Sequence, residues 1–231
     1  LAPGQPVLML SRRALLAAPA LLLATPARAA IELPESTTQG ALVVGRAPPL
    51  TRVAFNGKPL RVSDGVFAFG FGRDAPNVAV LDIKPPQGPP ETRRLTVVPR
   101  QYQEQRIAGL PPAQVTPAPE TMERIRREQA LLNAARAHDT AGAKFANGFA
   151  WPAEGRISGV YGSRRILNGE PRAAHLGLDI AAPAGTPAGA AAPGIIRLAE
   201  PDLYFTGGSI IVDHGHTVMT FYIHLSRLLV K

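Results

Sequence analysis

The sequence predicts a mainly β protein in which one helix joins two β-rich parts. From residue 31 to 99, short apolar runs alternate with Gly, Pro and Asn turns, and β- and glycine-rich runs return after residue 151. Regularly spaced short strands of this kind are typical of antiparallel sandwiches and barrels. We therefore expect a small N-terminal β-sandwich, a linker helix and a C-terminal antiparallel β-core.

The apolar runs between residues 31 and 99 each have the length of an ordinary strand. They read ALVVG, RVAFNGKPLRV, GVFAFGFG, VAVLDI and RRLTVV. Asn56-Gly57 interrupts the second run, and this dipeptide is a strong signal for a two-residue hairpin turn. Because this part contains no histidine, we expect it to serve binding, spacing or regulation rather than catalysis.

A proline-rich connector, GLPPAQVTPAP, occupies residues 109–119 and is expected to be extended and stiff. Residues 120–137 then read as a helix, with acidic residues in its first turns and Met122, Ile125 and Leu132 near one face. The charges around Arg124 and Glu128 are expected to form a solvated face. The predicted parts are thus residues 1–29 (upstream residues and signal peptide), 30–105 (sandwich), 106–145 (linker and helix) and 146–231 (C-terminal domain).

The first 30 residues read as an export signal. From Met9 the chain has an Arg12-Arg13 pair, an apolar run over residues 14–24 and an Ala-Arg-Ala cleavage pattern ending at Ala29. The run is shorter than the about 20 residues that span a bilayer, so we expect no transmembrane segment after signal cleavage. The arginine pair suits twin-arginine export, and the general secretory route fits equally. Either route leads to the periplasm or cell envelope.

Composition limits the classes of partner. The formal net charge is +8, and residues 1–30 contribute three arginines and no acidic residue, which leaves 8 − 3 = +5. No basic stripe is interleaved with aromatic residues, so nucleic acid is not an expected partner. A polyanionic cell-wall surface fits the modest basic excess. The chain has no cysteine, which excludes disulfides and a lipid anchor on an N-terminal cysteine.

Four of the five histidines lie after residue 151, and His175 stands four residues before Asp179 in HLGLDIAAPAGTP. The glycines and prolines of this segment make a helix improbable. On a straight strand these two residues would be roughly 13 Å apart. Imidazole and carboxylate are natural zinc ligands, and a bend at Gly177 would bring them together. The alternative is a turn that carries a histidine and an aspartate by chance.

A hairpin is predicted near the end of the sequence, where residues 209–213 and 218–225 flank the turn HGHT. Alternation places Thr220, Tyr222 and His224 on one face of the second strand. The other face then carries four apolar residues, which are Met219, Phe221, Ile223 and Leu225. His224 on the polar face is a candidate for neutral-pH chemistry. We interpret His214 and His216 in the turn as structural, although two histidines at a tight turn could also bind a metal.

Four motifs in order over residues 151–231 resemble the lysostaphin/LytM-type zinc metallopeptidases. They are GRISGVYGSRR, HLGLDIAAPAGTP, GGSIIVDHG and YIHLS. The resemblance implies a β-rich, largely antiparallel core with a groove across it, and cleavage of peptide bonds in the stem or cross-bridge peptides of peptidoglycan. It also implies that His175 and Asp179 are the first two zinc ligands, that His224 is a catalytic histidine, and that each complete domain holds one zinc ion.

The sequence departs from the family pattern at its end. The family's third zinc ligand lies in a His-x-His motif some tens of residues after the YxHLS strand, whereas this sequence stops at Lys231, seven residues after His224. We therefore expect a fragment of a longer peptidase, with an incomplete C-terminal core. The expected function is that of an exported zinc metalloendopeptidase that remodels peptidoglycan. The alternative is a non-catalytic LytM-like domain that binds the wall or regulates a partner such as an amidase.

Overall fold

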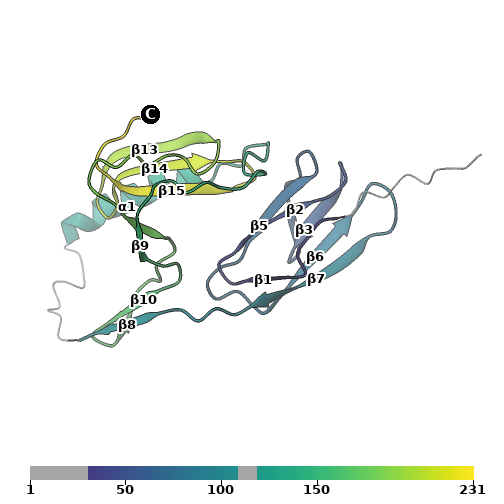
Figure 1. Ribbon diagram of the computed structural model, residues 1–231, viewed down its shortest axis with the longest axis horizontal. Helices are drawn as coiled ribbons and strands as arrows, with labels where there is room; N and C mark the ends of the chain where they lie inside the picture. The colour runs from purple at the N-terminus through teal and green to yellow at the C-terminus, as the bar shows by residue number, and fades with distance from the viewer. Residues whose placement is uncertain (1–30, 109–118) are drawn as a thin grey trace, which may run out of the picture.

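The computed structural model describes residues 31–108 and 119–231. The predicted export signal and nearly all of the proline-rich connector lie outside these residues. Figure 1 shows two β-rich lobes and a single helix among the described elements. Strand β8 (Glu104–Ile107), which follows the N-terminal lobe in the chain, lies beside β10 (Arg164–Leu167) of the C-terminal lobe. The mainly β fold class is confirmed. No helix in the described parts of the chain is long and apolar enough to cross a membrane.

The N-terminal lobe consists of two sheets. The larger has the strand order β1-β7-β6-β3-β4, and the smaller pairs β2 with β5. The bounds are β1 (Ser36–Thr38), β2 (Leu42–Arg46), β3 (Arg52–Phe55), β4 (Lys58–Leu60), β5 (Val66–Gly70), β6 (Val78–Lys84) and β7 (Glu91–Val98). All strand pairs are antiparallel except β1 with β7, which is parallel.

One hydrophobic core fills the space between these two sheets. Phe67 and Phe69 of β5 pack in the same buried cluster as Leu81 and Ile83 of β6. The ring of Phe69 also stacks on Phe55 with a centroid distance of 4.7 Å. Alternating inward residues from two facing sheets define a β-sandwich, so the sandwich prediction is confirmed.

The Asn56-Gly57 turn forms as predicted. Both residues have positive φ, 47° and 78°, between the paired Phe55 and Lys58 of β3 and β4. Two consecutive left-handed residues are the mark of a type I′ hairpin turn. The Asn56 side-chain oxygen also accepts a hydrogen bond from the Val80 amide at 2.9 Å, which ties the turn to β6.

Helix α1 (Pro119–Arg136) agrees with the predicted helix to within one residue at each end. Leu132 and Ala135 pack against Leu198, Leu203 and Ile211 of the C-terminal lobe.

The prediction of a solvated face at Arg124 and Glu128 was wrong. Arg124 donates to the Asp202 carbonyl oxygen at 2.7 Å, and Glu128 accepts a hydrogen bond from the Tyr204 amide at 2.7 Å. The pairing of β13 with β14 is irregular between Glu200 and Leu203, and a turn follows at residue 204, so the helix charges bind backbone groups where the strand ends.

The C-terminal lobe is built from small sheets. Its main sheet is an antiparallel meander of β13 (Ile195–Leu203), β14 (Gly207–Asp213) and β15 (Met219–Leu225). A second, two-stranded antiparallel sheet pairs β9 (Arg156–Gly159) with β12 (Asp179–Ala181). The predicted hairpin with its turn at residues 214–217 is confirmed by the pairing of β14 with β15.

A third sheet ties the two lobes together. Strand β10 (Arg164–Leu167) pairs antiparallel with β11 (Glu170–Pro171) and parallel with β8 (Glu104–Ile107). Because β8 follows directly from the sandwich, the chain that leaves the N-terminal lobe contributes a strand to the C-terminal lobe.

Side chains also join the lobes directly. Phe145 is fully buried in a cluster with Val66 and Ala68 of β5 and with Val218. Arg61 holds Asp139 in a bidentate pair at 2.9 and 2.7 Å.

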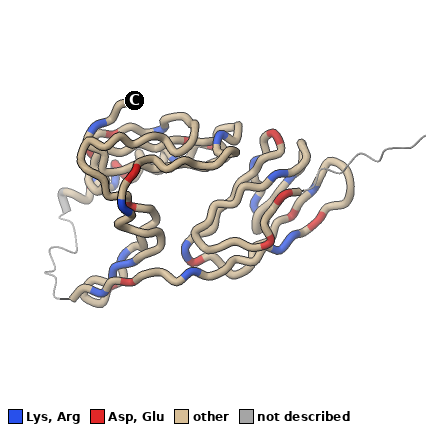
Figure 2. The backbone as a smooth tube through the Cα atoms, viewed as in Figure 1, with Lys and Arg blue, Asp and Glu red and all other residues tan. Residues whose placement is uncertain are grey.

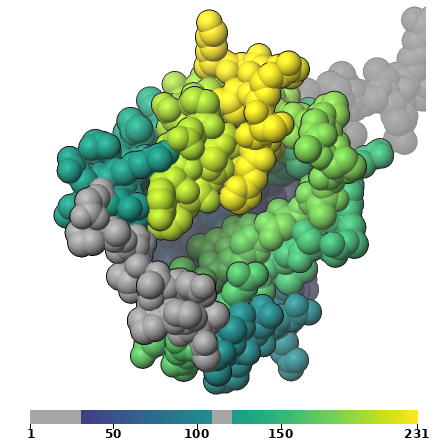
Figure 3. All heavy atoms as spheres, turned by 90° about the vertical axis from the view of Figure 1, so that its left-hand side faces the viewer, coloured from purple at the N-terminus to yellow at the C-terminus, as the bar shows by residue number. Residues whose placement is uncertain are grey.

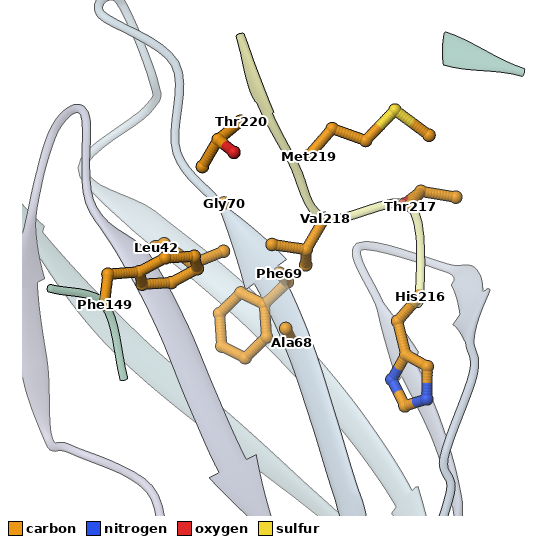
Figure 4. Close-up of a pocket in the computed structure, with 10 residues that line it drawn as sticks. All are labelled: Leu42, Ala68, Phe69, Gly70, Phe149, His216, Thr217, Val218, Met219 and Thr220. Atoms are coloured by element: carbon orange, nitrogen blue, oxygen red, sulfur yellow. The ribbon is translucent and has the colours of Figure 1, made fainter. Parts of the chain in front are cut away.

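A cavity of about 500 Å³ lies at this interface between the two lobes, between β5 and the start of β15. Figure 4 shows the side chains that line this cavity, which include Leu42 and Phe69 of the sandwich and Phe149 and Val218 of the C-terminal lobe.

His216 lies at this interface between the two lobes. Its Nε2 lies 2.9 Å from Ser63 Oγ of the sandwich, and its ring meets Phe145 edge-on. Burial lowers the pKa of His216; Arg61 lowers it further, and Asp139 opposes the shift. Since the folded pKa lies below the unfolded value of 6.5, this contribution to stability is present above pH 6.5 and is lost as the pH falls through the folded pKa.

We expect the unfolding midpoint in urea to fall when the pH is lowered from 7.5 to 5.0, and His216→Asn to reduce this fall. Asparagine tolerates the φ of 52° at this position and carries no group that titrates in this pH range. His138→Asn, at an exposed site beyond α1, is the matched control and should retain the pH dependence of the original protein. An unchanged pH dependence in His216→Asn would contradict the assignment.

Candidate metal centre

The structure brings His175 and Asp179 together. His175 Nε2 lies 3.1 Å from Asp179 Oδ1, far closer than a straight strand would allow. The chain bends at Gly177 between them. Gly177 is not among the glycines with positive φ, so the bend does not depend on a left-handed conformation there. The two side chains stay partly accessible, with 33% and 55% of their surface exposed.

Strand pairing positions the carboxylate. Asp179 begins β12, and its backbone pairs with Gly159 at the end of β9. A Cβ atom on Gly159 would lie 2.1 Å from Asp179 Oδ2. Glycine in a strand often marks such a close approach. The carboxylate therefore occupies space that any other residue at position 159 would fill.

The loop over residues 160–163, between β9 and β10, positions the histidine. The His175 amide donates to the Ser163 carbonyl oxygen at 2.8 Å, and the His175 carbonyl oxygen accepts from the Gly162 amide at 2.7 Å. His175 Nδ1 lies 3.2 Å from the Val160 carbonyl oxygen. A carbonyl oxygen can only accept, so Nδ1 carries the hydrogen in this contact.

This arrangement leaves two acceptors face to face. With the hydrogen on Nδ1, neutral His175 directs the Nε2 lone pair at a carboxylate oxygen. A proton or a cation must lie between the two atoms to make the contact favourable. Two ligands at 2.0–2.1 Å from one tetrahedral zinc ion would be roughly 3.3 Å apart, close to the observed 3.1 Å. Metal-ligating histidines also commonly donate their second ring N–H to a backbone carbonyl. The pair therefore fits a metal ion.

The pair has no third partner within the described residues. Over residues 31–108 and 119–231, no group of three or more His, Cys, Asp or Glu side chains is placed to hold a metal ion.

His224 lies on an irregular part of β15. Tyr222 pairs with Ile210 and Leu225 with Gly208, so both Ile223 and His224 stand opposite Ser209 in a bulge. The predicted alternation is therefore wrong beyond Tyr222, and Ile223, expected in the core, is 37% exposed. His224 is exposed and has a φ of 59°. Its backbone amide donates to the Thr206 carbonyl oxygen at 2.8 Å.

His214 directly follows β14 and is fully buried, and both of its ring nitrogens contact polar groups of the protein. Its Nδ1 lies 2.7 Å from the Pro193 carbonyl oxygen and its Nε2 lies 2.8 Å from Thr220 Oγ1. Thr220 Oγ1 is in turn 2.8 Å from the Tyr222 hydroxyl, which accepts from the Ala191 amide. Thr220 and Tyr222 thus share a face as predicted, and sequence reasoning missed the hydrogen-bond chain that joins them to His214.

The C-terminal lobe is hollowed on one face, and charges of both signs are spread over the molecule. In Figure 3 a hollow separates the strands β13–β15, yellow-green to yellow, from the green segment that contains β9–β12. Figure 2 shows Lys and Arg interspersed with Asp and Glu over both lobes. This distribution agrees with the absence of a basic stripe in the sequence.

Comparisons with known proteins show which family the chain resembles. Residues 173–231 match peptidase family M23. A peptidoglycan DD-endopeptidase of Vibrio cholerae, ShyA, is 39% identical over 77 residues, which are 33% of this chain and 18% of that relative. A lipoprotein NlpD/LppB homolog of Pseudomonas aeruginosa is 37% identical over 84 residues, 36% of this chain and 26% of that protein. The matches thus span about a fifth to a quarter of these curated relatives.

The fold agrees over a longer stretch. The crystal structure of a candidate M23 peptidase from Pseudomonas aeruginosa superposes with a TM-score of 0.59 and 26% identity, covering 84% of this chain and 76% of that one. The likeness includes the β-rich arrangement predicted from the sequence. The lysostaphin/LytM-type resemblance is confirmed, since residues 173–231 match the model of peptidase family M23.

Proposed function

We propose that this chain is part of an exported zinc metalloendopeptidase that hydrolyses peptide bonds of bacterial peptidoglycan in the periplasm or cell envelope. The observation that carries the proposal is the His175–Asp179 contact, in which Nε2 and Oδ1 lie 3.1 Å apart. The relationship to peptidase family M23 and the similarity to a peptidoglycan DD-endopeptidase support the reaction class and the substrate.

In this proposal, His175 Nε2 and Asp179 Oδ1 hold the metal, and the Val160 carbonyl oxygen fixes the His175 tautomer. A zinc ion bound there would supply Lewis acidity to the scissile carbonyl and to a water molecule. His224 is the proposed catalytic histidine. Its exposed position suits a side chain that accepts a proton from water or donates a hydrogen bond to the developing oxyanion.

The proposal requires a third protein ligand, since catalytic zinc sites usually have three. The family resemblance assigns this ligand to a His-x-His segment that follows the YIHLS strand. The two ligands in this chain would then form the first part of the site.

The test is to determine the gene sequence beyond the codon for Lys231 and to purify the full-length product. We expect one zinc ion per chain by elemental analysis and release of soluble peptides from purified peptidoglycan. Chelation should abolish the release, and added zinc should restore it. A metal-free product that leaves peptidoglycan intact would overturn the proposal.

His224→Gly tests the role of the exposed histidine. Glycine adopts a φ of 59° without strain, so we expect the free energy of unfolding to stay the same or rise by up to about 1 kcal/mol. Hydrolysis should fall by about 10²-fold or more, as is typical for loss of a general base. Denaturant unfolding and peptide release measure the two effects. Unchanged hydrolysis in a stable variant would remove His224 from the mechanism.

The second candidate function is a non-catalytic domain that binds the cell wall or regulates a partner such as an amidase. The observation that favours it is the 37% identity over 84 residues to a lipoprotein NlpD/LppB homolog, whose name is not that of a peptidase. This candidate predicts that the full-length product binds peptidoglycan sacculi in a sedimentation assay and contains no zinc. Binding without hydrolysis would support it, and zinc-dependent hydrolysis would exclude it.

A further inference from the structure

The 160–163 loop contacts His175 at three points. Two backbone hydrogen bonds join His175 to Gly162 and Ser163, and the Val160 carbonyl oxygen accepts from the His175 ring. The Ser163 hydroxyl also donates to the Val160 carbonyl oxygen at 3.0 Å. Any displacement of this loop therefore moves both the backbone and the ring of the proposed zinc ligand.

The same loop is held from its other side by the N-terminal sandwich. Arg73, between β5 and β6, donates from Nε to the Gly162 carbonyl oxygen at 2.7 Å. Its guanidinium lies 4.5 Å from the centroid of the Tyr102 ring, and its side chain is only 11% exposed. The Tyr102 ring lies so close to Gly162 that a Cβ atom added to Gly162 would be 2.0 Å from a carbon of the ring. Tyr161 fits in the same way against Gly40 of the sandwich.

We propose that Arg73 is a positioning residue for the metal centre, acting through Gly162 and the 160–163 loop to hold His175 in the orientation and tautomer that a metal ion requires. The inference rests on the proposed zinc site at His175 and Asp179. It gives the N-terminal sandwich a definite role, because the sandwich supplies part of the outer support of a ligand that lies in the other lobe.

The physical reason lies in the Gly162 carbonyl oxygen, which belongs to a buried residue. An arginine donor makes a charge-assisted hydrogen bond to it, and a methionine would leave that oxygen without this partner. The loop would then be free to shift, which changes the contact between Val160 and His175. The hydrogen bond made by one ring nitrogen sets which nitrogen is free to bind a metal.

The experiment compares Arg73→Met and Arg73→Lys with Arg93→Met. Arg73 also pairs with the Asp74 carboxylate at 2.6 Å. Arg93 is the matched control, since it likewise donates to a backbone carbonyl, that of Ile31 at 3.0 Å, and pairs with a carboxylate, that of Glu91. The first readout is the signal of the His175 Nδ1–H, which donates to the Val160 carbonyl oxygen, followed by ¹⁵N NMR of the metal-free protein at pH 8. The second is the affinity for Zn²⁺ alone, measured by competition with a chelating dye.

We expect this Nδ1–H signal in the original protein and in Arg93→Met, whether or not a proton also lies between Nε2 and the Asp179 carboxylate. Arg73→Met should lose the signal in part of its molecules and bind Zn²⁺ about tenfold more weakly. Arg73→Lys should lose about threefold, because an ammonium cannot both stack flat on Tyr102 and donate as Nε does.

An unchanged Nδ1–H signal and an unchanged affinity for Zn²⁺ in both Arg73 variants would overturn the inference. If Arg73→Met fails to fold, Arg73→Lys decides by the same criterion. Loss of the signal in Arg73→Met, when the unmodified protein binds no zinc, would support the positioning role and contradict the proposed metal site, so the two failures are distinguishable.

Discussion

Asp179→Asn is expected to lower the affinity for zinc by at least about 100-fold and to abolish peptidoglycan hydrolysis. This estimate exceeds the loss usual for residues that only support a ligand. Asparagine has the shape of aspartate, so the pairing of β12 with β9 should persist. Its side-chain NH₂ can donate directly to His175 Nε2, the atom that faces Asp179 Oδ1 at 3.1 Å. In the variant a hydrogen bond would therefore join the two side chains without a cation, and the site would no longer bind a metal ion.

The measurements are zinc affinity by chelator competition and peptide release from peptidoglycan, with thermal unfolding as a check on the fold. Asp82→Asn is the matched control, because its carboxylate accepts from Thr92 Oγ1 within the sandwich and an amide oxygen can do the same. His175→Ala should give the same loss as Asp179→Asn. Persistent zinc binding and hydrolysis in either variant would exclude that residue from the site.

Local sequence signals predicted most of the fold. The Asn56-Gly57 hairpin, the sandwich strands and helix α1 follow from turn chemistry and apolar periodicity, which depend on residues close together in the sequence. The parallel pairing of β1 with β7 and of β8 with β10 was not predicted. These pairings join segments about 60 residues apart, and alternation within one strand does not specify its partner.

The site was predictable in part for the same reason. Residue type and spacing led to the close approach of His175 and Asp179, since a metal pair four residues apart demands a bend. The position of His224 was harder to predict, because the bulge opposite Ser209 shifts the side chains beyond Tyr222. Arg73 could not have been found from sequence alone, since its contact with Gly162 spans 89 residues and involves only a backbone oxygen.

Gly159→Ala is expected to weaken zinc binding although it alters no ligand. Gly159 belongs to the motif GRISGVYG, where sequence analysis gave no reason for a glycine. In the structure an added Cβ would lie 2.1 Å from Asp179 Oδ2 and 2.8 Å from Asp179 Cγ. The carboxylate is the mobile end of a side chain and can rotate away, so the cost to stability should be about 1 kcal/mol or less. Rotation removes Oδ1 from His175, and the affinity for zinc should fall by at least about tenfold.

Two further glycines separate this effect from a general loss of stability. Gly72→Ala places its Cβ in open space with nothing within 4 Å, so both zinc affinity and unfolding should stay unchanged. Gly155→Ala would meet the Ala181 carbonyl oxygen at 2.5 Å, a backbone atom that cannot rotate away, and should lower stability. Chelator competition and urea unfolding of the three variants give the comparison. Gly159→Ala could instead lose stability and keep its affinity for zinc. The carboxylate would then not be the group that Gly159 accommodates. Asp179 would have to bind zinc in an orientation other than the one that faces His175.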